Sequence, residues 1–130
     1  GRALLLLEAQ GLIKLQDSSN LSATPKDIAE NPKNLEFVEL EAAQLTSRLP
    51  DLDVAVINGN YALDAGLTSA DALAVEAATG AAAEAYVNVL AVKEGRENDE
   101  AILALAKALQ SEEVRSFIDE KYSGGVVALF

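Results

Sequence analysis

Residues 54–60 read Val-Ala-Val-Ile-Asn-Gly-Asn, an apolar run that is closed by turn-forming residues. A short apolar run with such a boundary is typical of a strand that is buried on both faces of a parallel sheet. Working outward, residues 35–40 alternate apolar and acidic side chains, which predicts a strand with one solvent-exposed face. Residues 72–75 and 86–92 are further strand candidates, the second of them interrupted by Asn88.

Helical patterns with recognisable ends lie between these strands in the first part of the chain. The Leu-rich N-terminal helix is expected to end at Gly11, and residues 12–15 are expected to be extended. Thr24 is a suitable N-cap for a short helix that begins at Pro25 and stops at Pro32.

The later part of the chain continues the alternation. Helices are predicted over residues 41–49 and 61–65, and the Ala-rich stretch 76–85 is predicted to be a loop. Asn98 is expected to cap a helix with an apolar stripe, and Ser111 is expected to cap a second helix. This order of strands and helices predicts an α/β fold with a parallel or mixed sheet flanked by helices.

The charge balance and the missing residue types exclude several classes of function. The 130 residues contain 10 basic and 21 acidic side chains, a net charge of -11, which argues against nucleic acid and anionic membrane surfaces as partners. The chain has no Cys and no His, so it lacks thiolate and imidazole chemistry. Asp51 and Asp53 lack the remainder of a calcium loop. We therefore expect no enzyme activity, no cofactor and no bound metal.

Three polar side chains are candidates for ligand binding. Asn58 ends the predicted buried strand, where α/β sheets bind ligands, although the pair Asn58-Gly59 also suits a helix cap or a turn. Asn88 interrupts an apolar strand, where a buried amide needs partners; at a sheet edge it would simply point to water. Arg2 precedes a helix and can clamp a carboxylate, although an exposed terminal Arg fits the same sequence.

We expect neither a membrane span nor a signal peptide in the N-terminal stretch of these 130 residues. No apolar stretch is long enough to cross a bilayer, and the run at residues 4–7 is too short for a signal-peptide core. Because the chain contains no Met and opens at Gly1, we expect that processing removed its beginning or that it is a fragment.

Several stretches, taken in order, resemble one known family. They read GRALLLL at 1–7, GLIKL at 11–15, DIAENPKNL at 27–35, AVINGNYA at 55–62 and YVN at 86–88. Together they resemble the methionine-binding lipoproteins of the NlpA/MetQ type, and the resemblance covers essentially the whole chain. It implies a periplasmic-binding-protein fold, in which two α/β lobes hold the ligand in the cleft between them.

The resemblance also implies a function and roles for residues. It implies the substrate-binding component of an ABC importer for D- or L-methionine or a related amino acid, with the importer's permease as partner. A lipid anchor would hold such a protein outside the cytoplasmic membrane. At matching positions, Arg2 is similar to the Arg that holds the ligand carboxylate, and Asn58 and Asn88 are similar to the amides that contact the ligand.

The family's pattern extends beyond the N-terminal end of this chain, with the lipid-anchor Cys and most of a first lobe. Residues 1–86 are therefore expected to form the second, continuous lobe. Residues 87–130 are expected to be the crossing strand and C-terminal helices that belong to the first lobe. The alternative is an isolated structural or interaction lobe that binds no ligand in this form and is swapped or dimeric.

Overall fold

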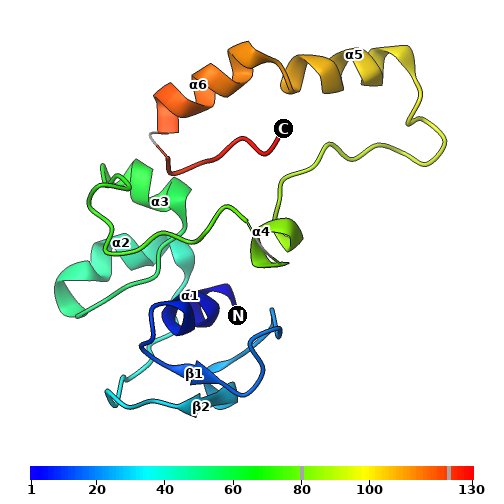
Figure 1. Ribbon diagram of the computed structural model, residues 1–130. Coiled ribbons are helices and arrows are strands. Elements are labelled where there is room, and N and C mark those ends of the chain that lie inside the picture. Colours follow the sequence, from blue (N-terminus) through cyan, green and yellow to red (C-terminus); the bar gives the residue numbers. More distant parts are fainter. Residues whose placement is uncertain (80, 123) are drawn as a thin grey trace.

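The structure, a computed structural model, describes residues 1–79, 81–122 and 124–130; the side chains of 81 and 82 are not described. Figure 1 shows the N-terminal elements together at the bottom of the view. The short helices of the middle of the chain lie above them, and the two longest C-terminal helices lie at the top.

The N-terminal part combines one helix with a small sheet. Helix α1 (Arg2–Ala9) ends at a turn in which Gly11 has a φ of 68°, a backbone conformation that glycine adopts without steric cost. Strands β1 (Lys14–Leu15) and β2 (Ile28–Glu30) pair antiparallel. The predicted N-terminal helix, its stop at Gly11 and the extended segment that follows are thus confirmed.

The buried core of the described chain lies under α1 and β1. Its side chains are between 3% and 6% exposed: Leu4, Ile13, Leu15 and Ala23. Partly buried apolar side chains pack around them: Leu5, Leu7, Ile28, Leu35 and Phe37. The backbone N–H of Leu15 donates to Glu8 Oε1 at 2.7 Å, which ties β1 to α1. Because all of these residues fall within residues 1–37, we call that segment the N-terminal unit.

A capping box lies between the two strands. The backbone N–H and the hydroxyl of Thr24 both donate to Asp27 Oδ2 at 2.8 Å. They cap η1 (Pro25–Asp27), a single 3-10 turn from which the chain passes directly into β2. The longer helix predicted from Pro25 is therefore wrong, because Ile28 pairs with Leu15 in the sheet and β-branched residues favour that environment.

The middle of the chain is built from short helical turns. These are η2 (Ala42–Gln44), α2 (Leu45–Arg48), η3 (Leu49–Asp51) and α3 (Gly59–Asp64). They confirm the helices predicted at residues 41–49 and 61–65, although the first is divided into three turns and the second begins at Gly59.

Four predicted strands carry no sheet pairing in the structure. Residues 35–40, 54–57, 72–75 and 86–92 are unpaired, and the sheet among the described residues is the two-stranded antiparallel pair β1–β2. Val54 is 52% exposed where a buried strand was predicted. An extended segment becomes a strand only where a second backbone lies alongside to exchange hydrogen bonds, and the described chain offers these four segments none.

The C-terminal part is mostly helical. It contains α4 (Ala81–Ala85), α5 (Glu100–Leu109) and α6 (Glu112–Tyr122). The loop predicted at residues 76–85 is wrong for its second half, since an Ala-rich segment has the highest helix propensity. Asp99 rather than Asn98 is the N-cap residue of α5. The predicted cap of α6 is confirmed, because Ser111 Oγ accepts a hydrogen bond from the backbone N–H of Val114 at 3.3 Å.

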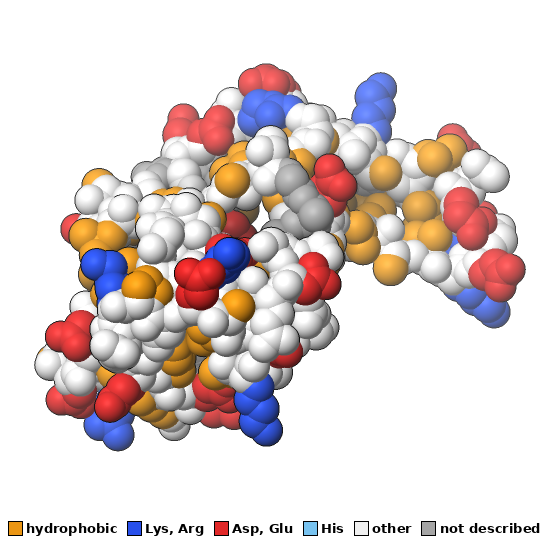
Figure 2. Space-filling model, turned by 60° about the horizontal axis from the view of Figure 1, so that its bottom comes forward, with side chains coloured by type: hydrophobic (Ala, Val, Ile, Leu, Met, Phe, Trp, Pro, Cys, Tyr) orange, Lys and Arg blue, Asp and Glu red, His pale blue; other side chains and the backbone are white. Residues whose placement is uncertain are grey.

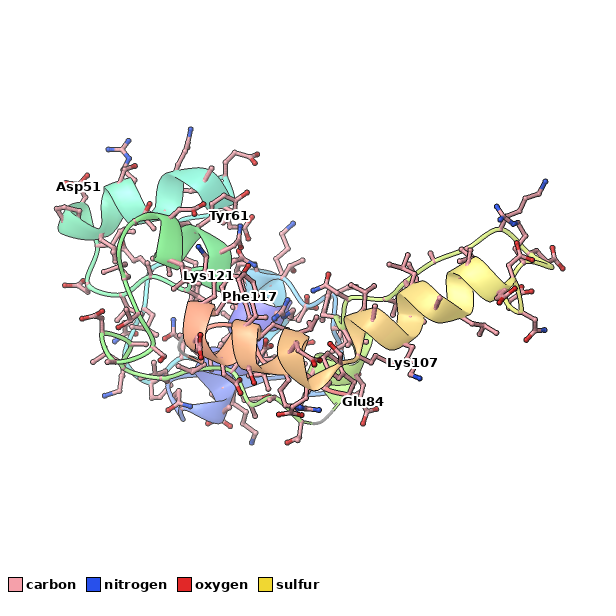
Figure 3. All side chains as sticks on the ribbon, turned by 90° about the horizontal axis from the view of Figure 1, so that it is seen from above. Asp51, Tyr61, Glu84, Lys107, Phe117 and Lys121 are labelled. Atoms are coloured by element: carbon pink, nitrogen blue, oxygen red, sulfur yellow. The ribbon has the colours of Figure 1, made fainter. Side chains whose placement is uncertain are left out.

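Residues 86–130, which we call the C-terminal arm, bury few apolar side chains. Among the described residues, α5 and α6 have no buried side chain, and Leu103 and Phe117 are 52% and 57% exposed. Figure 2 shows apolar side chains gathered on the extended part of this arm, and Figure 3 shows α5, with Lys107, reaching away from the rest of the chain. No helix in the described residues has the length and apolar character needed to cross a membrane.

A close backbone contact joins the arm to the middle of the chain. A Cβ on Gly59 would lie 2.7 Å from the carbonyl oxygen of Gly125, so the first position of α3 accepts only glycine without a shift. Gly124, which precedes that contact, has a φ of 84°. Farther along, the Arg115 guanidinium lies 4.9 Å from the centroid of the Phe130 ring, which holds the end of the chain against α6.

Candidate functional site

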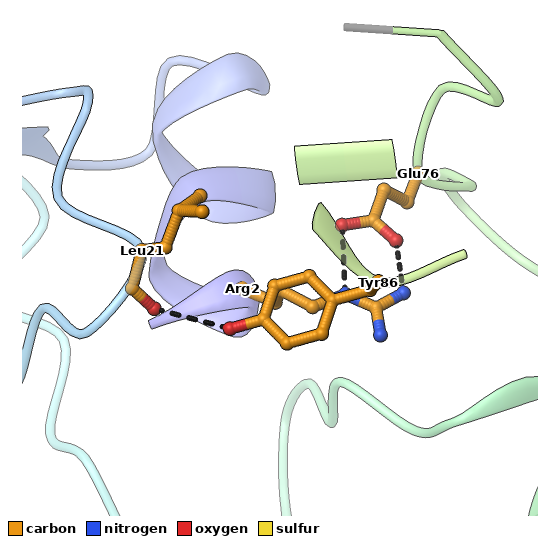
Figure 4. Close-up of polar contacts among 4 residues, drawn as sticks. All are labelled: Arg2, Leu21, Glu76 and Tyr86. Atoms are coloured by element: carbon orange, nitrogen blue, oxygen red, sulfur yellow. Dashed lines mark hydrogen bonds and ion pairs between the residues drawn. The ribbon is translucent and has the colours of Figure 1, made fainter. Parts of the chain in front are cut away.

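Arg2, the first residue of α1, makes a two-point ion pair with Glu76, which lies 74 positions later in the chain. Arg2 Nε donates to Glu76 Oε1 at 3.1 Å, and Arg2 Nη2 donates to Oε2 (Figure 4). The side chains are 41% and 28% exposed, so the pair is half-buried and open to solvent. Such a bidentate contact fixes the plane of the guanidinium.

Tyr86 covers one face of the same guanidinium. Its ring centroid lies 4.6 Å from Arg2 Cζ, the distance of a cation–π contact. The Tyr86 hydroxyl also donates to the carbonyl oxygen of Leu21 across a long 3.4 Å (Figure 4). The start of α1, the loop before β2, and the segments around Glu76 and Tyr86 therefore meet at one place. We call Arg2, Glu76 and Tyr86 the arginine site.

The electrostatics of the site keep Arg2 charged. Its hydrogen bonds to Glu76 raise the pKa of the guanidinium above its ordinary value, against the smaller opposing effect of partial burial. Among the ion pairs of the described residues, this one joins side chains 74 positions apart in the sequence, whereas the others join residues 3 or 16 positions apart. Among the described residues, no three acidic side chains gather closely enough to hold a metal ion.

The arrangement demonstrates one chemical capability of Arg2. Its guanidinium already holds a carboxylate by two parallel hydrogen bonds, the geometry that recognition of a free carboxylate requires. Within the described residues, Nη1 makes no hydrogen bond, so a second edge of the guanidinium keeps its donors. The terminal position of Arg2 is therefore not that of a freely exposed side chain.

Asn58 is the N-cap residue of α3. Its backbone is extended, and its carbonyl oxygen accepts the hydrogen bond from the backbone N–H of Ala62 at 3.1 Å. The side chain is exposed and, within the described part of the chain, makes no hydrogen bond. The position is thus that of the helix cap considered from the sequence, but its amide is not used for capping.

Asn88 lies in the unpaired segment 86–92. Its side chain is exposed and borders a hollow of about 330 Å³ together with Leu109 and Phe130. No hydrogen bond among the described residues joins either Asn58 or Asn88 to Arg2. The role of these two amides as ligand contacts stays a prediction.

Sequence reasoning missed Glu76 and gave Tyr86 no role of its own. Glu76 begins the Ala-rich stretch that was predicted to be a loop, where an acidic side chain is typical of a solvated surface. Its contact with Arg2 spans 74 positions, so no local spacing reports it. The available signal for Tyr86 is its place in the Tyr-Val-Asn motif that also contains Asn88.

Comparisons with known proteins agree with one another. A family model described as NlpA lipoprotein matches residues 1–130. The curated "Probable D-methionine-binding lipoprotein MetQ" of Pasteurella multocida is 48% identical over 128 residues, which is 98% of this chain and 45% of that protein. The "D-methionine-binding lipoprotein MetQ" of Salmonella typhi is 44% identical over 130 residues, with 98% and 46% covered.

The comparison with solved structures fixes the class. A nutrient-binding protein from Burkholderia cenocepacia, solved bound to methionine, matches with a TM-score of 0.85 and 47% identity over 99% of this chain and 54% of that one. The chain therefore has the α/β fold of such binding-protein lobes, as predicted. More particularly, it belongs to the NlpA lipoprotein family, which confirms the resemblance. It spans about half the length of the curated relatives that it matches.

Proposed function

We propose that this chain is part of the substrate-binding component of an ABC importer for methionine or a related amino acid. The observation that carries the proposal is the 47% identity and TM-score of 0.85 to a protein solved with methionine bound. Curated relatives named as D-methionine-binding lipoproteins, at 44% to 48% identity, point to the same ligand.

The arginine site supplies the physical support for an amino acid ligand. Arg2 is held on one edge by Glu76 and on one face by Tyr86, and a further edge carries donors suited to a carboxylate. In the proposed role, Arg2 binds the ligand carboxylate, and the side chains of Asn58 and Asn88 contact the ligand through amide hydrogen bonds. Amides are suited to this because each offers both a donor and an acceptor.

The same proposal includes a place and a partner. The protein acts outside the cytoplasmic membrane, is held there by a lipid anchor, and delivers its ligand to the importer's permease. It is a binding protein and carries out no catalysis, and it needs no cofactor for this role. The names of the relatives as lipoproteins support the location.

We propose the division of the chain that the sequence predicted. Residues 1–86 form one lobe, and residues 87–130 are the crossing segment and helices that complete the other lobe. Two observations favour this division. The N-terminal unit has its own buried core, whereas the C-terminal arm exposes Leu103, Leu105 and Leu109 by 45% to 52%. Apolar surface of that extent is suited to being covered by further protein.

Isothermal titration of the full-length gene product with L-methionine and D-methionine tests the proposed function. We expect binding of at least one of them with a stoichiometry of one ligand per protein. Binding to neither, together with no response to other free amino acids, would refute the proposal.

The exposed apolar arm also favours a second candidate, an interaction lobe that associates with a second copy of itself. Unpaired extended segments such as 86–92 offer backbone hydrogen-bonding groups to another chain. Sedimentation of the 130-residue chain at several concentrations separates the two candidates. Mass that rises with concentration, without any binding of amino acids by the full-length gene product, would favour the interaction lobe.

A further inference from the structure

The ion pair between Arg2 and Glu76 leaves binding capacity on both of its members. Glu76 takes the N–H of Arg2 Nε and one N–H of Nη2, and no other described residue takes the donors of the edge that Nη1 shares with Nη2. Each oxygen of Glu76 accepts one hydrogen bond from Arg2, and a carboxylate oxygen has room for another. One ligand can therefore accept hydrogen bonds from Arg2 and donate a hydrogen bond to Glu76 at the same time.

The charges of the pair restrict which ligand gains from this capacity. An anion beside the pair is attracted by Arg2 and repelled by Glu76 over similar distances, so the two effects largely cancel. A cation is attracted by Glu76 and repelled by Arg2, so it too gains little net energy. A molecule that carries an anionic and a cationic group on one carbon can place each group against the opposite charge of the pair.

We propose that Arg2 and Glu76 together form a site for the zwitterion of a free α-amino acid, in which Arg2 binds the carboxylate and Glu76 binds the ammonium group. This assignment rests on the proposed function and deepens it, because it makes Glu76 the residue that requires a free ammonium group. Tyr86 is a positioning residue in this site, since its ring lies 4.6 Å from the Arg2 guanidinium carbon and limits rotation of the side chain.

The environment of the pair fits such a ligand. At 41% and 28% exposure, both side chains are partly withdrawn from water but still reachable from solvent. Partial burial strengthens charge-assisted hydrogen bonds relative to fully exposed ones. An arginine guanidinium is charged throughout the range in which amino acids are zwitterions, and the contacts to Glu76 raise the pKa of Arg2 further.

Isothermal titration of the full-length gene product with three compounds tests the assignment. Methionine carries both charges, 2-hydroxy-4-(methylthio)butanoate has a hydroxyl in place of the ammonium group, and methioninol lacks the carboxylate. The wild-type protein should bind methionine about 10- to 100-fold more tightly than the hydroxy acid, the value of one charge-assisted hydrogen bond. Equal binding of methionine and the hydroxy acid by the wild type would overturn the assignment without any variant.

The variant Glu76→Gln then separates a ligand contact from a structural role. If Glu76 binds the ammonium group, the substitution reduces the preference for methionine over the hydroxy acid by about 10-fold or more. The preference for methionine over methioninol, which reports on Arg2, should change much less. If Glu76 only supports Arg2, the second preference falls instead and the first is retained, and that result would overturn the assignment.

Matched variants complete the experiment. Glu84→Gln removes the same charge from an exposed position on α4 and should leave both preferences unchanged. Glu76→Asp keeps the charge and should restore part of the preference for methionine over the hydroxy acid; it also serves if Glu76→Gln fails to fold. Failure of the proposed function would be seen separately, as a wild-type protein that binds no amino acid.

Discussion

The N-terminal unit and the C-terminal arm are both rich in apolar residues, but they bury them to different extents. In the N-terminal unit, Leu4, Ile13 and Leu15 are 3% to 6% exposed and pack in one cluster. In the arm, Leu105 and Leu109, which lie on the apolar stripe of α5, are each 45% exposed, and Leu103 of the same helix is 52% exposed. An apolar stripe thus predicts a helix reliably, but it contributes to stability only where a second surface covers it.

The largest expected effect tests whether a buried and an exposed leucine contribute differently to stability. In the 130-residue chain, Leu15→Ala should lower the free energy of unfolding by about 2–5 kcal/mol, because it leaves a cavity in the buried cluster. The matched substitution Leu103→Ala should change it by no more than about 0.5 kcal/mol, as for other exposed positions. Urea denaturation followed by circular dichroism measures both values.

The substitutions Leu15→Ala and Leu103→Ala can also be compared in the full-length gene product. If the arm is covered there, Leu103→Ala should become several times more costly, while the cost of Leu15→Ala stays similar. If both substitutions lower the free energy of unfolding of the 130-residue chain by the same amount, the cluster in the N-terminal unit is not a buried core.

The next effect concerns the arginine in each region that stacks on an aromatic ring. Arg2 stacks on Tyr86 and also holds a carboxylate, whereas Arg115 stacks on Phe130 and lies 3.6 Å from Glu112 on its own helix. Arg2→Lys should weaken methionine binding by the full-length gene product about 10- to 100-fold, because an ammonium group cannot present a two-point edge.

Arg115→Lys is the control, and it should leave the affinity for methionine unchanged within the error of titration. A comparable loss of affinity in both variants would mean that the contrast between the two stacked arginines has no bearing on ligand binding.

A smaller effect is expected at the point where the two regions touch. Gly→Ala within a helix usually stabilises by roughly 0.5–1 kcal/mol. At Gly59 the added methyl group would meet the carbonyl oxygen of Gly125 at 2.7 Å, so we expect Gly59→Ala to destabilise by about 1–3 kcal/mol instead. Thermal or urea unfolding checks the sign.

Asn60→Ala, one position further along α3 and exposed, provides the control for helix propensity. It should be neutral or slightly stabilising. Stabilisation by both substitutions would show that the arm does not press on α3 at Gly125.

The smallest expected effect is a dependence of stability on pH. Hydrogen bonds from the backbone N–H and hydroxyl of Thr24 lower the pKa of Asp27 below its ordinary 3.8, and Thr68 acts on Asp71 in the same way. A carboxyl group with a lowered pKa in the folded state adds stability above its ordinary pKa, and this is lost as the pH falls through the lowered value. The free energy of unfolding should therefore decrease below about pH 4.

Asp27→Asn and Asp71→Asn should each reduce the difference in stability between pH 7 and pH 3, measured by urea unfolding. If the N-terminal unit unfolds separately, only Asp27→Asn will alter its transition. Unchanged pH dependence in both variants would contradict the role of the two hydrogen-bonded turns.

Local patterns in the sequence predicted the elements that depend on local interactions. Gly11 was correctly identified as the end of a helix, and Ser111 as the cap of α6, because both act within one turn. The pairing of residues 54–57 was not predicted correctly, since an apolar run indicates burial but not which backbone lies beside it. The observed helix at Pro25 is shorter than the predicted one for a related reason, because Ile28 pairs with Leu15 in the sheet.

The residues of the candidate site also differ in how far the sequence could predict them. Arg2 could be singled out from its position before a helix in an acidic chain, and the family resemblance gave it a role. Glu76 could not be singled out, because its function depends on a contact across 74 positions. Asn58 and Asn88 remain predictions from the resemblance, and titration of Asn58→Ala and Asn88→Ala variants with methionine is the direct way to examine them.

The long separations at the arginine site bear on how the chain assembles and on how it tolerates change. Arg2 to Glu76 spans 74 positions and Leu21 to Tyr86 spans 65, so the two contacts close nearly the same loop. The entropy lost in closing a loop rises only with the logarithm of its length, by about 0.6 kcal/mol for each doubling. Once the first contact has closed the loop, the second forms with little further loss of entropy. Extra residues inserted at the exposed turn around Gly66 would therefore lengthen the loop at small cost and leave the ion pair able to form.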